Sequence, residues 1–292
     1  MIGVDWGTSS FRAFRLQGGV VVDRITGGPG ILAVPAGGFS DALRTAIGPW
    51  LDAGENRVLM SGMVGSRQGW VEAPYLACPA DPATLAAAAV AVPFEGAAVR
   101  LVPGLSAADA NGTPEVMRGE EVQVAGVLDR TGPSALICLP GTHSKWVRLA
   151  GGRIQGFATH MTGEAFAALR QHTILGRLMQ DGPTDEATFL QGVARAATPG
   201  GLLHHLFGVR TLGLFDRLAP AHAASFLSGL LIGHEVQAVG PRGPVHLVGA
   251  AALCSLYALA ITAAGSSAII LDQDAAATGL ARLAEHIVWT TP

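Results

Sequence analysis

Apolar runs and small polar turns alternate at the start of the chain. Residues 2–4 are apolar and lead to Asp5, a small turn that contains Gly7 follows, and apolar positions resume within residues 11–16. Two apolar runs joined by a glycine turn predict a β-hairpin. A further short apolar run at residues 20–25 predicts a third strand.

The same pattern returns in the middle of the chain. Residues 135–139 are apolar, a polar turn occupies residues 141–144, and strands are predicted at residues 145–149 and 154–159. Both turns have the sequence Gly-Thr-x-Ser. We therefore expect the same three-stranded unit twice.

Helical spacing of apolar residues predicts helices after each three-stranded unit. In the first half the expected order is helix 39–51, strand 57–61, helix 81–92, strand 98–102, a loop over 103–114 and helix 119–130. In the second half it is helices 164–179, 185–197 and 221–239, strand 245–248, helix 250–264, strand 267–271 and helix 274–286. Both halves thus have the order βββ-α-β-α-β-α, which predicts an α/β protein with two lobes, residues 1–131 and 132–292.

Composition supports large buried cores and narrows the choice of partners. Of the 292 residues, 49% are hydrophobic and 14% charged, which argues against disorder and favours two domains. The net charge of -3 provides no basic patch for nucleic acid, so we expect none as a partner.

The chain is expected to be cytoplasmic and to bind no membrane. Asp5 interrupts the first apolar run, so no secretion signal is visible, and the uncharged residues 247–265 are mostly small and fit a buried strand, turn and helix. The three cysteines, Cys78, Cys138 and Cys254, are far apart and predict free thiols.

The first turn could hold phosphate. Gly7 allows close approach of a ligand, the hydroxyls and amides of Thr8, Ser9 and Ser10 can donate to oxyanions, and Asp5 can hold a hydrated Mg²⁺ ion. From these residues alone, an ordinary polar turn is equally expected.

The duplicated order resembles the actin-like ATPase superfamily, which includes hexokinases and sugar kinases, over the whole chain. This resemblance implies a ribonuclease H-like duplication in which each lobe is a mixed five-stranded sheet with helices on both faces. It also implies that ATP binds with one turn from each lobe facing its phosphates. The resemblance makes Gly249 the expected adenosine contact, and the second phosphate turn would contain Gly141, Thr142, His143, Ser144 and Lys145.

Six sequence words are similar to those of the 2-dehydro-3-deoxygalactonokinase family. They are Ile-Gly-Val-Asp-Trp-Gly-Thr at 2–8, Gly-Met-Val-Gly-Ser at 62–66 with Gly-Trp at 69–70 and Ala-Pro-Tyr at 73–75, Val-Met-Arg-Gly-Glu-Glu-Val-Gln at 116–123, Leu-Pro-Gly-Thr-His-Ser-Lys-Trp at 139–146, Met-Thr-Gly-Glu at 161–164 and Phe-Leu-Ser-Gly-Leu-Leu-Ile-Gly at 226–233. This resemblance implies phosphorylation by ATP of the 6-hydroxyl of 2-dehydro-3-deoxy-D-galactonate, a step of galactonate breakdown.

The resemblance also suggests the catalytic base. Related sugar kinases carry an acid at the start of the helix before the second phosphate turn, where this chain has Glu120 and Glu121. Adjacent helical residues point about 100° apart, so one of them is expected to face the substrate, and the sequence leaves open which. Asp109 is the runner-up, although with Asn111 it also fits a simple turn.

The glycine-rich loop after the predicted strand 57–61 is expected to bind the sugar acid, as loops at strand ends often do. The loop amides, Ser66, Arg67 or Arg118 could donate to its carboxylate, and Trp70 and Tyr75 could equally contact the sugar or pack beneath the loop. The predicted substrate residues are Ser61, Gly62, Met63, Val64, Gly65, Ser66, Trp70 and Arg118.

Two other functions stay open at this stage. A kinase of the same fold could act on another sugar acid or polyol, because the fold fixes the phosphate chemistry better than the acceptor. A non-enzymatic actin-like sensor or assembly protein is the alternative from another class. Whether the chain forms a homo-oligomer is open, and His204 with His205 is expected to be a surface pair.

Overall fold

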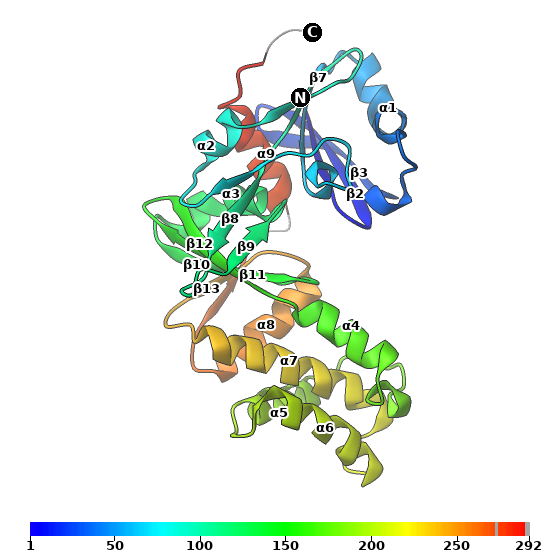
Figure 1. Cartoon of the computed structure of the whole chain (residues 1–292), viewed down its shortest axis with the longest axis vertical. Coiled ribbons are helices and arrows are strands. Elements are labelled where there is room, and N and C mark those ends of the chain that lie inside the picture. The colour runs from blue at the N-terminus through cyan, green and yellow to red at the C-terminus, as the bar shows by residue number, and fades with distance from the viewer. Residues whose placement is uncertain (272–273, 290–292) are drawn as a thin grey trace. The chain divides into compact units, whose positions relative to one another are not determined.

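The computed structural model describes residues 1–271 and 274–289 (Figure 1). The chain forms two compact units. Unit 1 contains Met1–Ser134, Val147–Ala158 and the described residues from Asp274 onward, and unit 2 contains Ala135–Trp146 and Thr159–Leu271. The predicted lobe boundary between residues 131 and 132 stays a prediction, and residues 272–273 and 290–292 of the predicted second lobe lie outside the described residues.

The first sheet has six strands in the order β3-β2-β1-β4-β7-β6. The predicted number of five is wrong here because β6 adds an antiparallel strand beside β7, where a helix was expected to continue to residue 92. The strands are β1 (Ile2–Trp6), β2 (Ser10–Gln17), β3 (Val20–Pro29), β4 (Arg57–Ser61), β6 (Val90–Val92) and β7 (Ala98–Leu101).

The register of this sheet positions the first predicted phosphate turn. Strands β1 and β4 are parallel, with Asp5 opposite Ser61, so the segments that follow both strands leave the same edge of the sheet. Strands β1 and β2 are antiparallel, with Asp5 opposite Arg12. Carboxyl ends of adjacent parallel strands are where α/β proteins place ligands.

In the described part of unit 1, four α-helices accompany this sheet: α1 (Phe39–Asp52), α2 (Pro82–Ala87), α3 (Glu120–Thr131) and α9 (Ala275–Ala284). Leu43 and Ile47 of α1 are fully buried against the sheet core. Helix α9 packs on α3, and Arg282 Nη1 donates to the carbonyl of Ala125 at 2.8 Å. By packing, α9 thus lies in unit 1, although its position in the sequence led us to expect it in the second lobe.

A small sheet of three strands was not predicted. It contains β5 (Tyr75–Ala77), β8 (Gly104–Ala108) and β9 (Pro114–Met117), in the order β5-β8-β9. The expectation of a loop over residues 103–114 is therefore wrong at both ends. Strands of three to five residues between Gly and Pro give too few positions for an alternating pattern to be recognised.

The second sheet has five strands, as predicted, in the order β12-β11-β10-β13-β14. Strands β10, β13 and β14 run parallel. The strands are β10 (Ala135–Leu139), β11 (Ser144–Ala150), β12 (Arg153–His160), β13 (Val245–Leu247) and β14 (Ala268–Ile270).

Helix α7 is the centre of the helical part of unit 2, where it contacts α4, α5, α6 and α8 (Figure 1). The helices are α4 (Thr162–His172), α5 (Glu186–Ala196), α6 (Gly201–Leu214), α7 (Ala223–Val239) and α8 (Ala251–Ala263). Asp185 caps α5 by accepting from the Thr188 amide at 2.8 Å. No described helix is long and apolar enough to cross a membrane.

Helix α6 was not predicted, and its histidine pair is not wholly at the surface. His205 is fully buried, while His204 is exposed. The Nδ1 atom of His205 lies 3.0 Å from His234 Nε2, and its Nε2 atom lies 3.1 Å from the carbonyl of Pro199. The expectation of a surface pair is therefore wrong for His205.

The cysteines agree with the prediction of free thiols. Cys138 and Cys254 are buried, and Cys78 is half-buried. Burial raises the pKa of the Cys138 thiol, with smaller contributions from Glu235 and Cys254.

Candidate active site

The first turn joins β1 to β2 and exposes its hydroxyl groups. The amide of Gly7 donates to the carbonyl of Ser10 at 2.8 Å and closes the turn. Thr8, Ser9 and Ser10 are exposed, and Gly7 is half-buried. The turn therefore presents three hydroxyl-bearing residues to solvent, and its role as a phosphate loop stays a prediction.

Asp5 lies at the end of β1, and its side chain is 13% exposed. The carboxylate of Asp5 forms an ion pair with the guanidinium of Arg12 on β2. The described residues contain no group of three or more His, Cys, Asp or Glu side chains that could hold a metal ion. A single carboxylate fits a hydrated Mg²⁺ ion, which keeps several waters, better than a fully protein-bound metal.

The segments after β4 and before α3 meet beside Asp5. Gly62 has φ +94, and a Cβ atom there would lie 2.7 Å from the carbonyl oxygen of Trp6 and 3.3 Å from Asp5 Oδ1. A Cβ atom on Gly119, φ +104, would lie 3.2 Å from Gly62 Cα. Both positions require glycine, which explains how the predicted substrate loop and predicted base come together in unit 1.

The two adjacent glutamates differ sharply in burial. Glu121 is fully buried, and its Oε1 and Oε2 atoms accept from the amide of Gly119 at 2.9 and 2.7 Å. Burial, followed by the nearby charge of Glu120, raises the pKa of Glu121 to about 8. Glu120 is half-buried, and its Oε2 atom accepts from the amide of Arg118 at 3.0 Å. Of the two carboxyl groups, only that of Glu120 reaches solvent.

Arg118 is a buried cation with unused donors. Its side chain is 7% exposed, its Nη2 donates to the carbonyl of Ala73 at 2.8 Å, and its guanidinium lies 4.3 Å from the centre of the Tyr75 ring. Among the described residues, its Nε and Nη1 atoms find no hydrogen-bond partner, nor does the buried Oγ of Ser66. A Cβ atom on Gly65 would lie 3.0 Å from Nη1, so the loop backbone passes directly beside this cation.

The other predicted substrate residues of this loop are buried or half-buried. Ser61 is buried and its hydroxyl lies 3.5 Å from the Val4 carbonyl. Val64 is buried and Met63 is half-buried. Trp70 stacks on Phe39 at 6.3 Å, which places it in the core cluster of unit 1. Packing beneath the loop, one of the two roles expected for Trp70, is therefore the one its surroundings favour.

Asp109 lies in the turn between β8 and β9 and is exposed. Its Oδ1 atom accepts from the amides of Asn111 and Thr113, each at 2.8 Å. These bonds lower the pKa of Asp109. The geometry is that of a turn-forming aspartate, the structural alternative expected from the sequence.

The second turn joins β10 to β11 and packs on the start of α4. The Glu164 amide donates to the carbonyl of Thr142 at 3.0 Å, and a Cβ atom on Gly163 would lie 2.4 Å from the Gly141 carbonyl oxygen. Thr142 and His143 are exposed, and the His143 ring contacts the carboxylate of Glu164. Two separate family words, at 139–146 and 161–164, thus form one structure.

The last two residues of the predicted second phosphate turn are buried. The Ser144 hydroxyl is fully buried and lies 2.6 Å from the Tyr257 hydroxyl. Lys145 is 6% exposed, and its Nζ donates to Thr159 Oγ1 at 2.9 Å. The side chain of Lys145 is therefore not solvated, and that of Ser144 does not extend from the turn.

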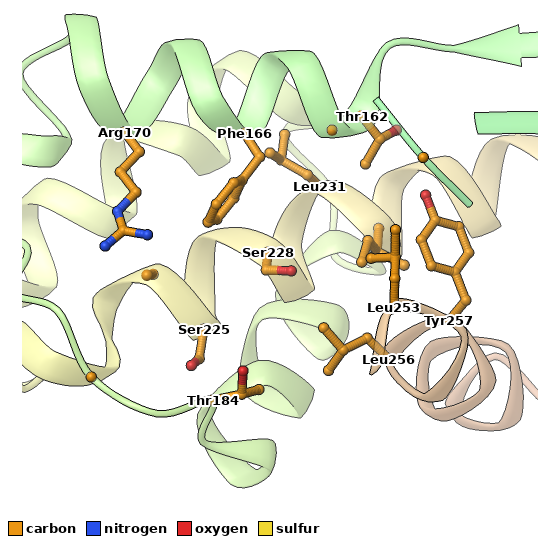
Figure 2. Close-up of a pocket in the computed structure, with 15 residues that line it drawn as sticks. Thr162, Phe166, Arg170, Thr184, Ser225, Ser228, Leu231, Leu253, Leu256 and Tyr257 are labelled. Atoms are coloured by element: carbon orange, nitrogen blue, oxygen red, sulfur yellow. The ribbon is translucent and has the colours of Figure 1, made fainter. Parts of the chain in front are cut away.

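A cavity of about 290 Å³ opens in unit 2 beside the second turn (Figure 2). Phe166 and Arg170 point into it from α4, with Ser225 and Ser228 of α7 opposite them. Gly249, the predicted adenosine contact, is not among its lining residues. It lies before α8, and a Cβ atom on it would lie 3.4 Å from the carbonyl oxygen of Pro140. The lining residues are Gly141, Thr162, Gly163, Phe166, Arg170, Gly182, Thr184, Ala224, Ser225, Ser228, Leu231, Ile232, Leu253, Leu256 and Tyr257.

No sequence pattern predicted this cavity, because its lining comes from α4, α7, α8 and the connecting segments. Its volume and mixed apolar and polar lining suit a small molecule. Only Gly141 belongs to the set of residues predicted from the sequence.

A solved structure of low sequence identity has the same fold. The activator of the 2-hydroxyisocaproyl-CoA dehydratase from Clostridium difficile, with bound ADPNP, aligns with a TM-score of 0.53 at 14% identity and covers 98% of this chain and 95% of its own. The order of the strands in the two sheets and this likeness define an actin-like ATPase fold.

The sequence relatives define the family. A protein of Rhizobium meliloti (strain 1021) named as a probable 2-dehydro-3-deoxygalactonokinase is 37% identical over 98% of this chain and 96% of its own length. The 2-dehydro-3-deoxygalactonokinase of Escherichia coli (strain K12) is 31% identical over 98% of both chains. A Sinorhizobium meliloti crystal structure described under the same enzyme name has a TM-score of 0.90 at 37% identity and covers 97% of this chain and 98% of its own. The chain belongs to the 2-keto-3-deoxy-galactonokinase family, which it matches over residues 5–283.

Proposed function

We propose that the chain transfers the γ-phosphate of ATP to the 6-hydroxyl of 2-dehydro-3-deoxy-D-galactonate. The proposal draws on the enzyme name of the relatives and on one observation in unit 1, the buried guanidinium of Arg118. Its Nε and Nη1 atoms have no partner among the described residues, and the unpaired Ser66 hydroxyl belongs to the adjoining loop. Buried donors of this kind cost free energy unless a ligand accepts from them, and a carboxylate does so well.

An acidic acceptor explains this arrangement better than a neutral sugar. Tyr75 covers the guanidinium and the Ala73 carbonyl accepts from Nη2, so the orientation of Arg118 is fixed before any substrate binds. A fixed, desolvated guanidinium loses little entropy on binding a carboxylate. We infer that Arg118, with Ser66, selects the acid end of the substrate.

The adenosine part of ATP is assigned to the cavity of unit 2, and phosphate oxygens are the ligand proposed for each turn taken by itself. The adenosine would occupy the cavity, where Phe166 and Leu256 offer apolar contact and Ser228 offers a hydroxyl. The exposed hydroxyls of Thr8 and Thr142, with the amides around them, would donate to the phosphates.

Asp5 would hold Mg²⁺ through water, since its carboxylate lies at the end of β1 beside the first turn. When bound, the ion supplies positive charge that neutralises the phosphate oxygens. Arg12, which is paired with Asp5, would keep that carboxylate oriented.

Glu120 is proposed as the base. In the transfer, the substrate hydroxyl oxygen forms a bond to the γ-phosphorus, the bond from that phosphorus to the bridging oxygen of ADP breaks, and ADP leaves with the electron pair. The hydroxyl proton passes to a carboxylate near the acceptor. Glu120 is the better choice because its side chain reaches solvent, whereas Glu121 is enclosed and Asp109 is held in a turn.

The decisive experiment is a coupled ADP-release assay with a panel of 2-keto-3-deoxy acids, aldonic acids and polyols. We expect the highest kcat/KM with 2-dehydro-3-deoxy-D-galactonate, and NMR of the product should place the phosphate on carbon 6. A preference for a neutral polyol would refute the acid acceptor. Phosphate on another carbon would refute the regiochemistry alone.

Substitution of the three acids tests the base. Glu120→Gln should lower kcat at least about 100-fold while ATP binding persists. Glu121→Gln and Asp109→Asn are the matched amide controls and should keep most of the activity. If a folded Glu121→Gln or Asp109→Asn variant is the inactive one, the base is that residue.

A further inference from the structure

Glu235 is a buried acid of unit 2 that has no role in the transfer step proposed above. It belongs to α7, is 4% exposed, and lies beside the core cluster that contains Trp146 and Tyr257. Its Oε1 atom accepts from Trp146 Nε1 at 2.6 Å. Its Oε2 atom accepts from the Tyr257 hydroxyl at 2.7 Å and from the Thr162 hydroxyl.

The hydrogen-bond directions in this cluster are determined by its donors. The indole of Trp146 can only donate, and the single proton of the Tyr257 hydroxyl points to Glu235. The oxygen of Tyr257 must then accept from the Ser144 hydroxyl, 2.6 Å away. Burial and the charge of Glu235 raise the pKa of Tyr257, so its hydroxyl keeps the proton that it donates.

The ends of this network lie at the nucleotide site. Thr162 and Tyr257 line the cavity, on its side nearest α8 in Figure 2. Ser144 is the first residue of β11 and directly follows the exposed part of the second turn. One carboxylate thus connects the wall of the cavity with the base of the turn.

We propose that Glu235 is a positioning residue for ATP, which sets Thr162 and Tyr257 in the cavity wall and, through Tyr257, holds Ser144 and the second turn. This inference rests on the proposed function only in that ATP occupies the cavity of unit 2. It assigns Ser144 a supporting role as well, because the proton of its buried hydroxyl is used toward Tyr257.

Two substitutions break the network without removing bulk. Glu235→Gln replaces one acceptor oxygen with an NH₂ group, so that at least one of the three donors loses its acceptor. Tyr257→Phe removes the hydroxyl that links Ser144 to Glu235. We expect each variant to raise the Kd and KM for ATP about tenfold, while the KM for the keto acid stays within about twofold.

A stability control separates positioning from general destabilisation. Val193→Ala removes two methyl groups from the same core, where Val193 is 4% exposed and has no polar side-chain atom that could join the network. The Tm of each variant is measured, and ATP binding is followed by calorimetry without acceptor. At a similar loss of Tm, Val193→Ala should leave the Kd for ATP unchanged.

The outcomes distinguish this inference from the proposed function. If Val193→Ala weakens ATP binding as much as Glu235→Gln does, or if both network variants bind ATP like the wild type, Glu235 has only a structural role. Wild-type ATP binding with no turnover of the keto acid would refute the proposed acceptor and leave this inference standing. A wild-type chain that binds no ATP would refute both.

Discussion

Glu121 provides a sharp test of the structure, because its neutral and charged forms should differ strongly in stability. The carboxyl group is fully buried, and both of its oxygens accept from the amide of Gly119. Burial, then the charge of Glu120, raises the pKa of Glu121 to about 8 from an ordinary value of 4.5. Glu121→Gln keeps the size of the side chain and removes the titration.

The sign and size of the effect follow from proton linkage. Between pH 4.5 and 8 the folded chain holds a proton on Glu121 that the unfolded chain has released. The free energy of unfolding of the wild type therefore falls as pH rises, by about 1 kcal/mol per pH unit from this group. The glutamine variant lacks this slope. Between pH 6 and 8 it should gain about 2 kcal/mol relative to the wild type.

Urea unfolding of both proteins at pH 6, 7 and 8 measures this difference directly. Asp52→Asn, an acid-to-amide change at an exposed position of α1, is the matched control and should give the same difference at every pH. If the free energies of unfolding of Glu121→Gln and the wild type differ by the same amount at every pH, Glu121 is not enclosed in its protonated form. Because the assay needs no substrate, this outcome is independent of which acid is the base.

Three further predictions concern other polar groups of the two units. Arg118→Met should raise the KM for the keto acid about tenfold or more and leave the KM for ATP unchanged. Arg67→Met, a control at an exposed position, should change neither KM in initial-rate assays. The reverse result would make Arg67 the carboxylate donor. Glu164→Gln removes the acid that contacts His143, so kcat/KM for ATP should fall about three- to tenfold with no change in the KM for the acceptor. Unchanged kinetics would exclude the pair of His143 and Glu164 from phosphate binding. Burial lowers the pKa of His234, so as the pH falls the unfolded chain binds a proton before the folded chain does, and the free energy of unfolding decreases below about pH 6.5. Urea unfolding at pH 7 and pH 5 should show that His234→Asn loses less free energy of unfolding than the wild type. An equal loss in both proteins would contradict the lowered pKa of His234.

The parts of the fold that sequence patterns predicted are those with long or repeated signals. Both hairpins follow the repeated Gly-Thr-x-Ser turn, and helices α5 and α8 show clear periodicity or an uncharged run of helical length. The parts that were missed have signals that point elsewhere. Strand β6 has three residues and follows an alanine-rich helix, and α6 is apolar on nearly all sides, so no face could be recognised.

Packing between distant segments explains why the site could be predicted only in part. The exposed residues of the two turns could be named because a local sequence determines a turn. The cavity of unit 2 could not, since its lining is drawn from three helices that the sequence does not place together. Gly249, chosen by resemblance, lies just before the helix that contributes Leu253, Leu256 and Tyr257 to that cavity, and its role as the adenosine contact stays a prediction.

The choice between Glu120 and Glu121 shows the limit of sequence reasoning most clearly. Both begin the same helix, and a helix dipole would favour an acid at either position. In the folded chain Gly119 has a positive φ and its amide donates to the carboxylate of Glu121, which is the enclosed side chain of the two. Gly119 also lies close to Gly62, which directly follows β4. Because Gly62 of the predicted substrate loop and Gly119 beside the proposed base meet in the folded chain, an alanine at either position should disturb substrate binding and the base together.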